Sequence, residues 1–223
     1  MNRQIKDDIW NINRYNLPRF QIIVADPPWF YNDQKRVRKD GKTPTRGIGA
    51  CHHYTQMKEK ALASFDMQGL MADRCHLYMW ATMPLLDQAL RLISAWGLTY
   101  VTTAFAWIKM NRGVWKEKNT QQTSFVSGGL KEAIEGATFF GPGYYTASNA
   151  EIVLLARKGK PFRHAEHRKL SQVVYAPLSP VHSQKPEEIQ DRIDYMYPMI
   201  ENKLELFARR HRPGWVTYGN ENE

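Results

Sequence analysis

The residues best suited to chemistry in this sequence form an acidic turn after an apolar segment. Residues 20–25 are mostly apolar and β-branched, as is typical of an inner strand of a parallel sheet, and Asp26-Pro27-Pro28-Trp29 follow directly. Because two consecutive prolines can neither continue a helix nor donate to a sheet ladder, we expect the strand to end at Asp26. A carboxylate at the carboxyl end of a strand stands at the edge where open α/β sheets bind ligands.

This turn could orient an exocyclic amine such as the 6-amino group of adenine. The lone pair of that nitrogen is delocalised into the ring, and accepting its two N–H bonds favours the tetrahedral geometry that localises the lone pair. Asp26 and a carbonyl of Pro27 or Pro28 could accept these bonds, and Trp29 offers a flat face for an unstacked base. We therefore predict that these four residues are catalytic. The structural alternative is a strand that ends in a proline-rich turn with a core tryptophan.

The elements that would position this turn follow from the periodicity of the chain. The pattern predicts helices near 57–72, from Pro84 to Trp96 and after Pro186, and long loops at about 32–50 and 111–147. It also predicts seven strands, near 20–25, 74–81, 100–109, 151–157, 172–176, 203–208 and 215–218. This order indicates a single α/β domain over 1–223, built around a mostly parallel sheet.

Composition limits the classes of protein to consider. The 223 residues are 43% hydrophobic and 24% charged, which are globular values, and no apolar run approaches the roughly 18 residues of a membrane span. The formal charge of +9 favours a polyanionic partner without proving one. Cys51 and Cys75 form no Cys-x-x-Cys pair, and His164 and His167 alone offer too few ligands for a metal. We expect a cytoplasmic protein without a metal site.

Two basic clusters could contact phosphates. The expected loop at about 32–50 carries Lys35, Arg36, Arg38, Lys39, Lys42 and Arg46. Its place after the acidic turn suggests a lid that contacts phosphates, although a merely solvated basic loop is the alternative. The second cluster runs from Arg157 to Arg163 and continues at Arg168-Lys169. We interpret it as a turn that tracks a phosphate backbone.

The acidic turn resembles the D-P-P-W signature of a known family. That family comprises the eukaryotic mRNA adenosine methyltransferase catalytic subunit and its bacterial and phage DNA adenine methyltransferase relatives. The resemblance implies a Rossmann-like fold with permuted motif order, in which the acceptor motif precedes part of the cofactor site. It implies S-adenosylmethionine (SAM) as the cofactor, with in-line methyl transfer from its sulfonium to the amine of a flipped adenine.

Further motifs extend the resemblance over roughly residues 8–221, with gaps at 32–50 and 111–140. For the cofactor it implies Asp8, Ile9, Asp26, Lys185, Phe207, Arg209, His211, Asn220 and Glu221. Lys185 would pair with the carboxylate of SAM. Family members often carry Asn where this chain has Arg212, and Gln where it has Glu221.

For the substrate, the resemblance implies a second set of residues. These are Trp29, Tyr54, Lys109, Tyr144, Tyr145 and Glu151. Glu151 would accept a hydrogen bond from the substrate, and the two adjacent tyrosines are suited to base stacking. A core Trp107 with Lys109 at the solvent edge remains an equal alternative for the Trp-x-Lys segment.

The last expectation concerns which nucleic acid is the substrate. Compact size and the lack of appended RNA-binding modules favour DNA adenine and a bacterial or phage enzyme of the restriction-modification kind. An RNA adenosine methyltransferase is one alternative, and a catalytically inactive nucleic-acid-binding partner subunit is another. Monomer and homodimer both stay open.

Overall fold

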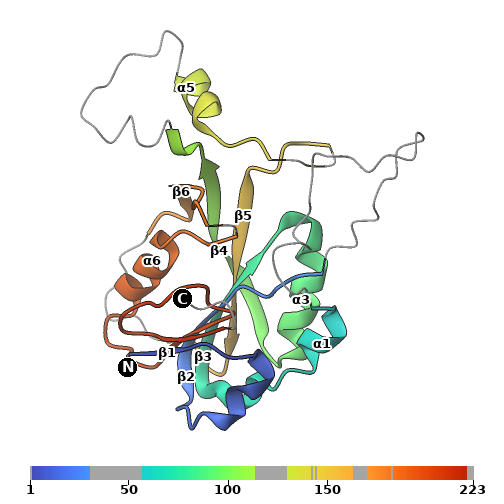
Figure 1. Cartoon of the computed structure of the whole chain (residues 1–223), viewed down its shortest axis with the longest axis vertical. Coiled ribbons are helices and arrows are strands. Elements are labelled where there is room, and N and C mark those ends of the chain that lie inside the picture. The colour runs from blue at the N-terminus through green and yellow to red at the C-terminus, as the bar shows by residue number, and fades with distance from the viewer. Residues whose placement is uncertain are drawn as a thin grey trace.

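The computed structural model describes residues 2–30, 57–113, 130–141, 143, 145–162, 170–181 and 183–219. They form one open sheet of eight strands in the order β1-β8-β7-β2-β3-β5-β4-β6 (Figure 1). The strands are β1 (Arg3–Ile5), β2 (Phe20–Ala25), β3 (Met71–Ala81), β4 (Thr99–Met110), β5 (Ala150–Lys158), β6 (Val173–Pro177), β7 (Lys203–Leu206) and β8 (Val216–Tyr218). Every neighbouring pair is parallel except β3–β5 and β4–β5.

The mostly parallel α/β sheet is confirmed, with one strand more than the seven predicted. The additional strand is β1, which pairs with β8 from Arg3↔Val216 to Ile5↔Tyr218. Three residues are too short to show a periodicity, so their sequence carries no strand signal. This pairing brings the N-terminal segment beside the C-terminal strand.

β2 lies inside the sheet between β3 and β7, and this explains its apolar sequence. Its side chains alternate between two cores: Ile23 and Ala25 belong to the core beneath α3, whereas Ile22 and Val24 belong to the core beneath α6. The strand ends at Ala25, immediately before Asp26, as predicted. The acidic turn is therefore mounted on a strand that is buried on both faces.

Helices cover both faces of this sheet (Figure 1). The described helices are the 3₁₀ helix η1 (Ile9–Arg14), α1 (Glu59–Ala63), α2 (Met67–Leu70), the 3₁₀ turn η3 (Met83–Leu85), α3 (Leu86–Ala95), α5 (Leu130–Ala137) and α6 (Glu188–Met196), of which α5 lies beyond the end of β4. α1 and α3 pack against one face and α6 against the other. None of the helices described is both long and apolar enough to cross a bilayer.

Two local predictions were wrong. The single helix expected near 57–72 is two short helices, because the Asp66 side chain accepts from Gly69 N at 3.0 Å and starts α2 anew. Met71 then already belongs to β3. The stretch 111–147, expected to be a loop, contains α5, which leads to a bridge between Thr138 and Met110.

Candidate active site

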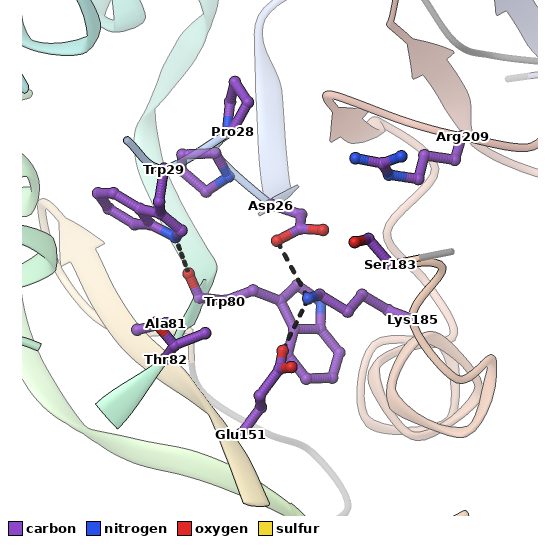
Figure 2. Close-up of a pocket in the computed structure, with 11 residues that line it drawn as sticks. Asp26, Pro28, Trp29, Trp80, Ala81, Thr82, Glu151, Ser183, Lys185 and Arg209 are labelled. Atoms are coloured by element: carbon purple, nitrogen blue, oxygen red, sulfur yellow. Dashed lines mark hydrogen bonds and ion pairs between the residues drawn. The ribbon is translucent and has the colours of Figure 1, made fainter. Parts of the chain in front are cut away.

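The acidic turn lines a small pocket of about 130 Å³ at the carboxyl edge of β2 and β3 (Figure 2). The turn after β2, the end of β3, the start of β5, the segment before α6 and the turn after β7 all contribute. Their lining residues are Asp26, Pro27, Pro28, Trp29, Trp80, Ala81, Thr82, Glu151, Ser183, Lys185 and Arg209. Because β5 is antiparallel, its first residues reach the edge where β2 and β3 end, and this brings Glu151 opposite Asp26.

Four charged side chains form a connected cluster in and beside this pocket. The Lys185 ammonium lies 2.7 Å from Glu151 Oε2 and 3.4 Å from Asp26 Oδ1. Lys109 Nζ lies 2.7 Å from the other carboxylate oxygen, Glu151 Oε1. The indole of Trp80 lies beneath Lys185, with its ring centroid 5.2 Å from the ammonium. Lys185, predicted to pair with the cofactor, thus bridges two carboxylates of the pocket.

The two carboxylates of this cluster differ in their proton affinity. Burial raises the pKa of Asp26, the ammonium of Lys185 opposes the rise, and the charge of Glu151 adds to it. Burial would also raise the pKa of Glu151, but Lys185 and Lys109 together hold that pKa at about 2. Glu151 is therefore a fixed anion, whereas Asp26 takes up a proton more readily than an ordinary aspartate.

The proline carbonyls already hold the turn in place. The carbonyl of Pro27 accepts from Trp29 N at 2.8 Å, and that of Pro28 accepts from Met57 N at 2.8 Å. Each carbonyl oxygen has a second lone pair, so either can still accept a bond from a substrate amine. These two hydrogen bonds therefore hold the turn in place, and its carbonyl oxygens can still accept hydrogen bonds from a substrate.

Trp29 differs from the expectation of an open stacking face. Its side chain is only 4% exposed, and its indole N–H donates to the carbonyl of Trp80 at 3.3 Å (Figure 2). The indole belongs to the core shared with α3 because the turn folds it back between β2 and β3. Trp29 is a buried wall of the pocket.

The turn after β7 packs closely against the end of β8. Phe207 has a φ of 60°, and Ala208 N donates to the Tyr218 carbonyl at 3.0 Å. A Cβ on Gly219 would lie 2.3 Å from the Ala208 carbonyl oxygen, so this backbone contact requires glycine. It brings the segment that carries Arg209 beside the chain that continues to Asn220 and Glu221.

The predicted Asp8 and Ile9 lie near the same strand. The Asp8 carbonyl accepts from the Tyr218 hydroxyl at 2.9 Å, and its carboxylate accepts from Trp10 N at 3.1 Å as the N-cap of η1. Ile9 is buried at 7% exposure. The structure thus places Asp8 beside β8, the strand that precedes Asn220 and Glu221 in the sequence.

Other predicted residues lie away from the pocket lining. His211 Nδ1 is 3.5 Å from Thr217 Oγ1, and Phe207 packs against the core beneath α3. Tyr145 is fully exposed and contributes nothing to the pocket wall. Tyr54, Tyr144, Asn220, Glu221 and the basic loop at about 32–50 lie outside the described residues.

Arg212, where the family often has Asn, contacts α6. Its Nη2 lies 2.7 Å from Asp191 Oδ1 and 2.7 Å from Asp194 Oδ2. Asp194 also accepts from Lys203 Nζ at 2.6 Å and from the Trp215 indole at 3.1 Å. The arginine therefore ties the turn after β7 to a helix.

The described part of the second basic cluster, residues 157–162, begins at the edge of the sheet opposite the pocket. Lys158 pairs with Cys75 at the start of β3, whereas Ile152 pairs with Ala81 at its end. Lys158 stands seven positions after Glu151 on β5, which is about 24 Å of extended chain. The role of this cluster in contacting phosphates stays a prediction, and Arg163, Arg168 and Lys169 lie outside the described residues.

Sequence reasoning missed four lining residues: Trp80, Ala81, Thr82 and Ser183. The first three stand where the second predicted strand ends, at the same edge as Asp26, and that position was a usable signal. Ser183 has a φ of 60°. Ser183 and Phe207 are the non-glycine residues with positive φ in the described parts of the chain, and such strain is typical of functional sites.

Comparisons with known proteins identify the family of this chain. Residues 20–221 match the MT-A70 family. The chain is 32% identical over 215 residues to the Type II methyltransferase M.MunI of Mycoplasma sp, an alignment that covers 92% of this chain and 79% of that protein. It is 27% identical to human METTL4, an N(6)-adenine-specific methyltransferase, in an alignment that covers 91% of this chain and 37% of that protein. It is 24% identical to the human N(6)-adenosine-methyltransferase catalytic subunit METTL3, in an alignment that covers 92% of this chain and 28% of that protein.

Proposed function

The chain belongs to the MT-A70 family of adenine N6-methyltransferases, and we propose that it transfers a methyl group from SAM to the exocyclic 6-amino group of adenine in DNA. The observation that carries this proposal is the convergence of Asp26 with Lys185 and Arg209 in one pocket. These residues are far apart in the sequence. Their meeting joins the amine-orienting turn to the segment that the resemblance assigns to the cofactor.

The described residues fit SAM chemically. SAM carries a sulfonium, an ammonium and a carboxylate, and the pocket presents the carboxylate of Asp26 together with the cationic Arg209 and Lys185. The contact of Gly219 with Ala208 leaves no room for a Cβ beside the segment that leads to Asn220. Asp26, Lys185, Arg209, Asp8 and the residues after Gly219 would hold SAM. When bound, it supplies an electrophilic methyl group on a good leaving group.

The residues of the chain supply orientation and charge. Asp26 and the second lone pair of a proline carbonyl would accept the two N–H bonds of the amine, which localises the nitrogen lone pair. Asp26 has a raised pKa, so its carboxylate could also take the proton that the methylated amine loses. Glu151, as a fixed anion, would keep Lys185 beside Asp26.

The proposal of DNA rests on the higher similarity to the bacterial Type II methyltransferase. The chain is 32% identical to M.MunI over 215 residues and 24% identical to METTL3 over 208 residues. METTL3 is named for adenosine, and RNA is therefore the second candidate substrate. Both candidates share the same pocket chemistry.

Radiolabelled SAM with matched DNA and RNA oligonucleotides tests the function and the substrate. We expect label at adenine N6 in DNA and none in RNA. Asp26→Ala should abolish transfer while keeping the wild-type melting temperature. Label in RNA alone would replace DNA by RNA, and full activity of the Asp26 variant would refute the mechanism. No label with either substrate would favour an inactive binding subunit.

SAM binding can be measured without substrate. A ligand that binds only the folded state stabilises it by about 2.7 kcal/mol at 100 times its Kd. We therefore expect SAM to raise the melting temperature of the wild-type protein. An unchanged melting temperature at saturating SAM would count against the cofactor site.

A further inference from the structure

Glu205 is a buried carboxyl that the mechanism above does not use. It lies on β7 and pairs with Val24 of β2, two residues before Asp26. Paired residues of parallel strands point to the same face, and alternate residues of one strand share a face, so Glu205 and Asp26 both face α6. The acid that orients the amine thus has a second acid on the neighbouring strand.

One carboxylate oxygen of Glu205 is buried without a hydrogen bond to the described part of the chain. Its Oε2 is shielded from solvent, and it has no hydrogen-bond partner among the described residues. The Gln190 side chain, on α6, lies close enough to lower the pKa of Glu205, but its Nε2 and Glu205 Oε2 make no hydrogen bond of normal geometry with the described residues. An unsatisfied buried carboxyl is costly, so it calls for a functional explanation.

The cations that face Glu205 are already engaged elsewhere. Arg210 lies 3.2 Å from Glu187, and Arg212 contacts Asp191 and Asp194, all on or at the start of α6. Burial raises the pKa of Glu205 to about 7, Arg210 opposes the rise, and the charge of Asp26 adds to it. Glu205 therefore takes up a proton far more readily than an ordinary glutamate.

We propose that Glu205 is a specificity residue of the cofactor site which, together with Asp26, makes the site favour a ligand with a positive sulfur over the neutral thioether left after methyl transfer. This inference rests on the function proposed above. A cation placed beside Asp26 attracts negative charge in both buried acids, so its binding drives Glu205 towards the carboxylate. A neutral thioether exerts no such pull.

The consequence is a proton released when SAM binds. A partly protonated carboxyl releases a fraction of a proton when it is driven to full ionisation. Because binding releases the proton, SAM affinity should rise with pH through the region around 7. The affinity for S-adenosylhomocysteine should change less over the same range.

Isothermal titration calorimetry tests the proposal. SAM and S-adenosylhomocysteine are titrated at pH 7 in two buffers of different ionisation enthalpy, which yields the protons released per ligand. We expect a measurable release of a fraction of a proton with SAM and a clearly smaller release with S-adenosylhomocysteine. Glu205→Gln should remove most of the release with SAM and reduce the preference for SAM over S-adenosylhomocysteine several-fold.

Glu201→Gln is the matched control, because Glu201 is exposed before the start of β7 and its loss changes the net charge equally. It should release protons as the wild type does. Equal release with both ligands, or unchanged release in the Glu205 variant, would overturn the inference. The comparison of ligands on the wild type remains decisive even if the Glu205 variant folds poorly. Failure of the wild type to bind SAM at all would instead refute the proposed function.

Discussion

The two carboxylates of the pocket show how position decides the role of a residue. Asp26 and Glu151 are both largely buried, but Glu151 has an ammonium on each oxygen, whereas Asp26 shares one ammonium at 3.4 Å. The number of close cations therefore separates their pKa values. One acid is suited to exchange protons and the other to hold charge.

Glu151→Gln should lower stability at neutral pH. The change leaves Lys109 and Lys185 without their shared anion, which for a buried pair costs about 3 kcal/mol. The folded pKa of about 2 lies below the ordinary value of 4.5, so the stabilisation is present above pH 4.5 and is lost as pH falls towards 2. Urea unfolding at pH 7 and pH 3 measures both effects. Glu59→Gln, which removes a similar pair with Arg91 at the surface, is the control. An equal loss in both variants would contradict the prediction.

Gly219→Ala should disrupt the cofactor site. The new methyl group would lie 2.3 Å from the Ala208 carbonyl, so the end of β8 must move away from the turn after β7. We expect a loss of about 2 kcal/mol in the free energy of unfolding and weaker SAM binding by calorimetry. Gly136→Ala is the matched control, because a Cβ at that helical position meets nothing within 4 Å. Normal SAM affinity in the Gly219 variant would show that the backbone contact is not required.

At the scale of elements, α6 acts as the support of the turn after β7. Asp194 accepts from Lys203, Arg212 and Trp215, and therefore joins the helix to β7, to that turn and to the residue before β8. Arg212 replaces the Asn common in the family and is used for this connection. The departure from the family motif thus has a structural reason.

Asp194→Asn tests this connection. The variant keeps the shape of the side chain but loses the charge that two cations share, so we expect a loss of about 2 kcal/mol in thermal or chemical unfolding. The control is Asp191→Asn, since Asp191 contacts only Arg212 in the described residues, with its side chain 61% exposed. It should have little effect. Similar stability of the two variants would contradict a supporting role for Asp194.

At the scale of the whole molecule, the antiparallel direction of β5 decides which of its charged residues lie at the pocket. It brings Glu151 to the pocket edge and carries Arg157 and Lys158 to the opposite edge. The described residues of the second basic cluster, 157–162, therefore begin at the end of β5 that lies away from the pocket. The net charge of +9 still favours a polyanion as a partner.

DNA affinity should fall steeply with salt, and chiefly through the first basic cluster. Lys35→Ala combined with Lys39→Ala should reduce the slope of log K against log salt by about 1.8, the value for two lost phosphate contacts. Lys158→Ala combined with Lys160→Ala lowers the net charge equally and should leave the slope nearly unchanged. Fluorescence anisotropy at several salt concentrations measures both variants. Equal slopes for the two double variants would contradict a larger role of the first basic cluster in contacting phosphates.

The sequence by itself determined the sheet class and the position of the acidic turn. It did so because local rules govern these features: apolar runs make buried strands, consecutive prolines end them, and strand ends carry ligands. The seven predicted strands are all present, and Asp26, Lys185 and Arg209 line one pocket. Short elements such as β1 and α2 were missed because pairing and capping decide them.

Only the tertiary structure decided which charges meet. The antiparallel direction of β5 is not encoded in its apolar pattern, yet it places Glu151 between Lys109 and Lys185 and removes Lys158 from the site. Similarly, the register of β7 against β2 places Glu205 behind Asp26. Strand direction and register arise from the packing of the whole sheet, and the pKa values of the site depend on them.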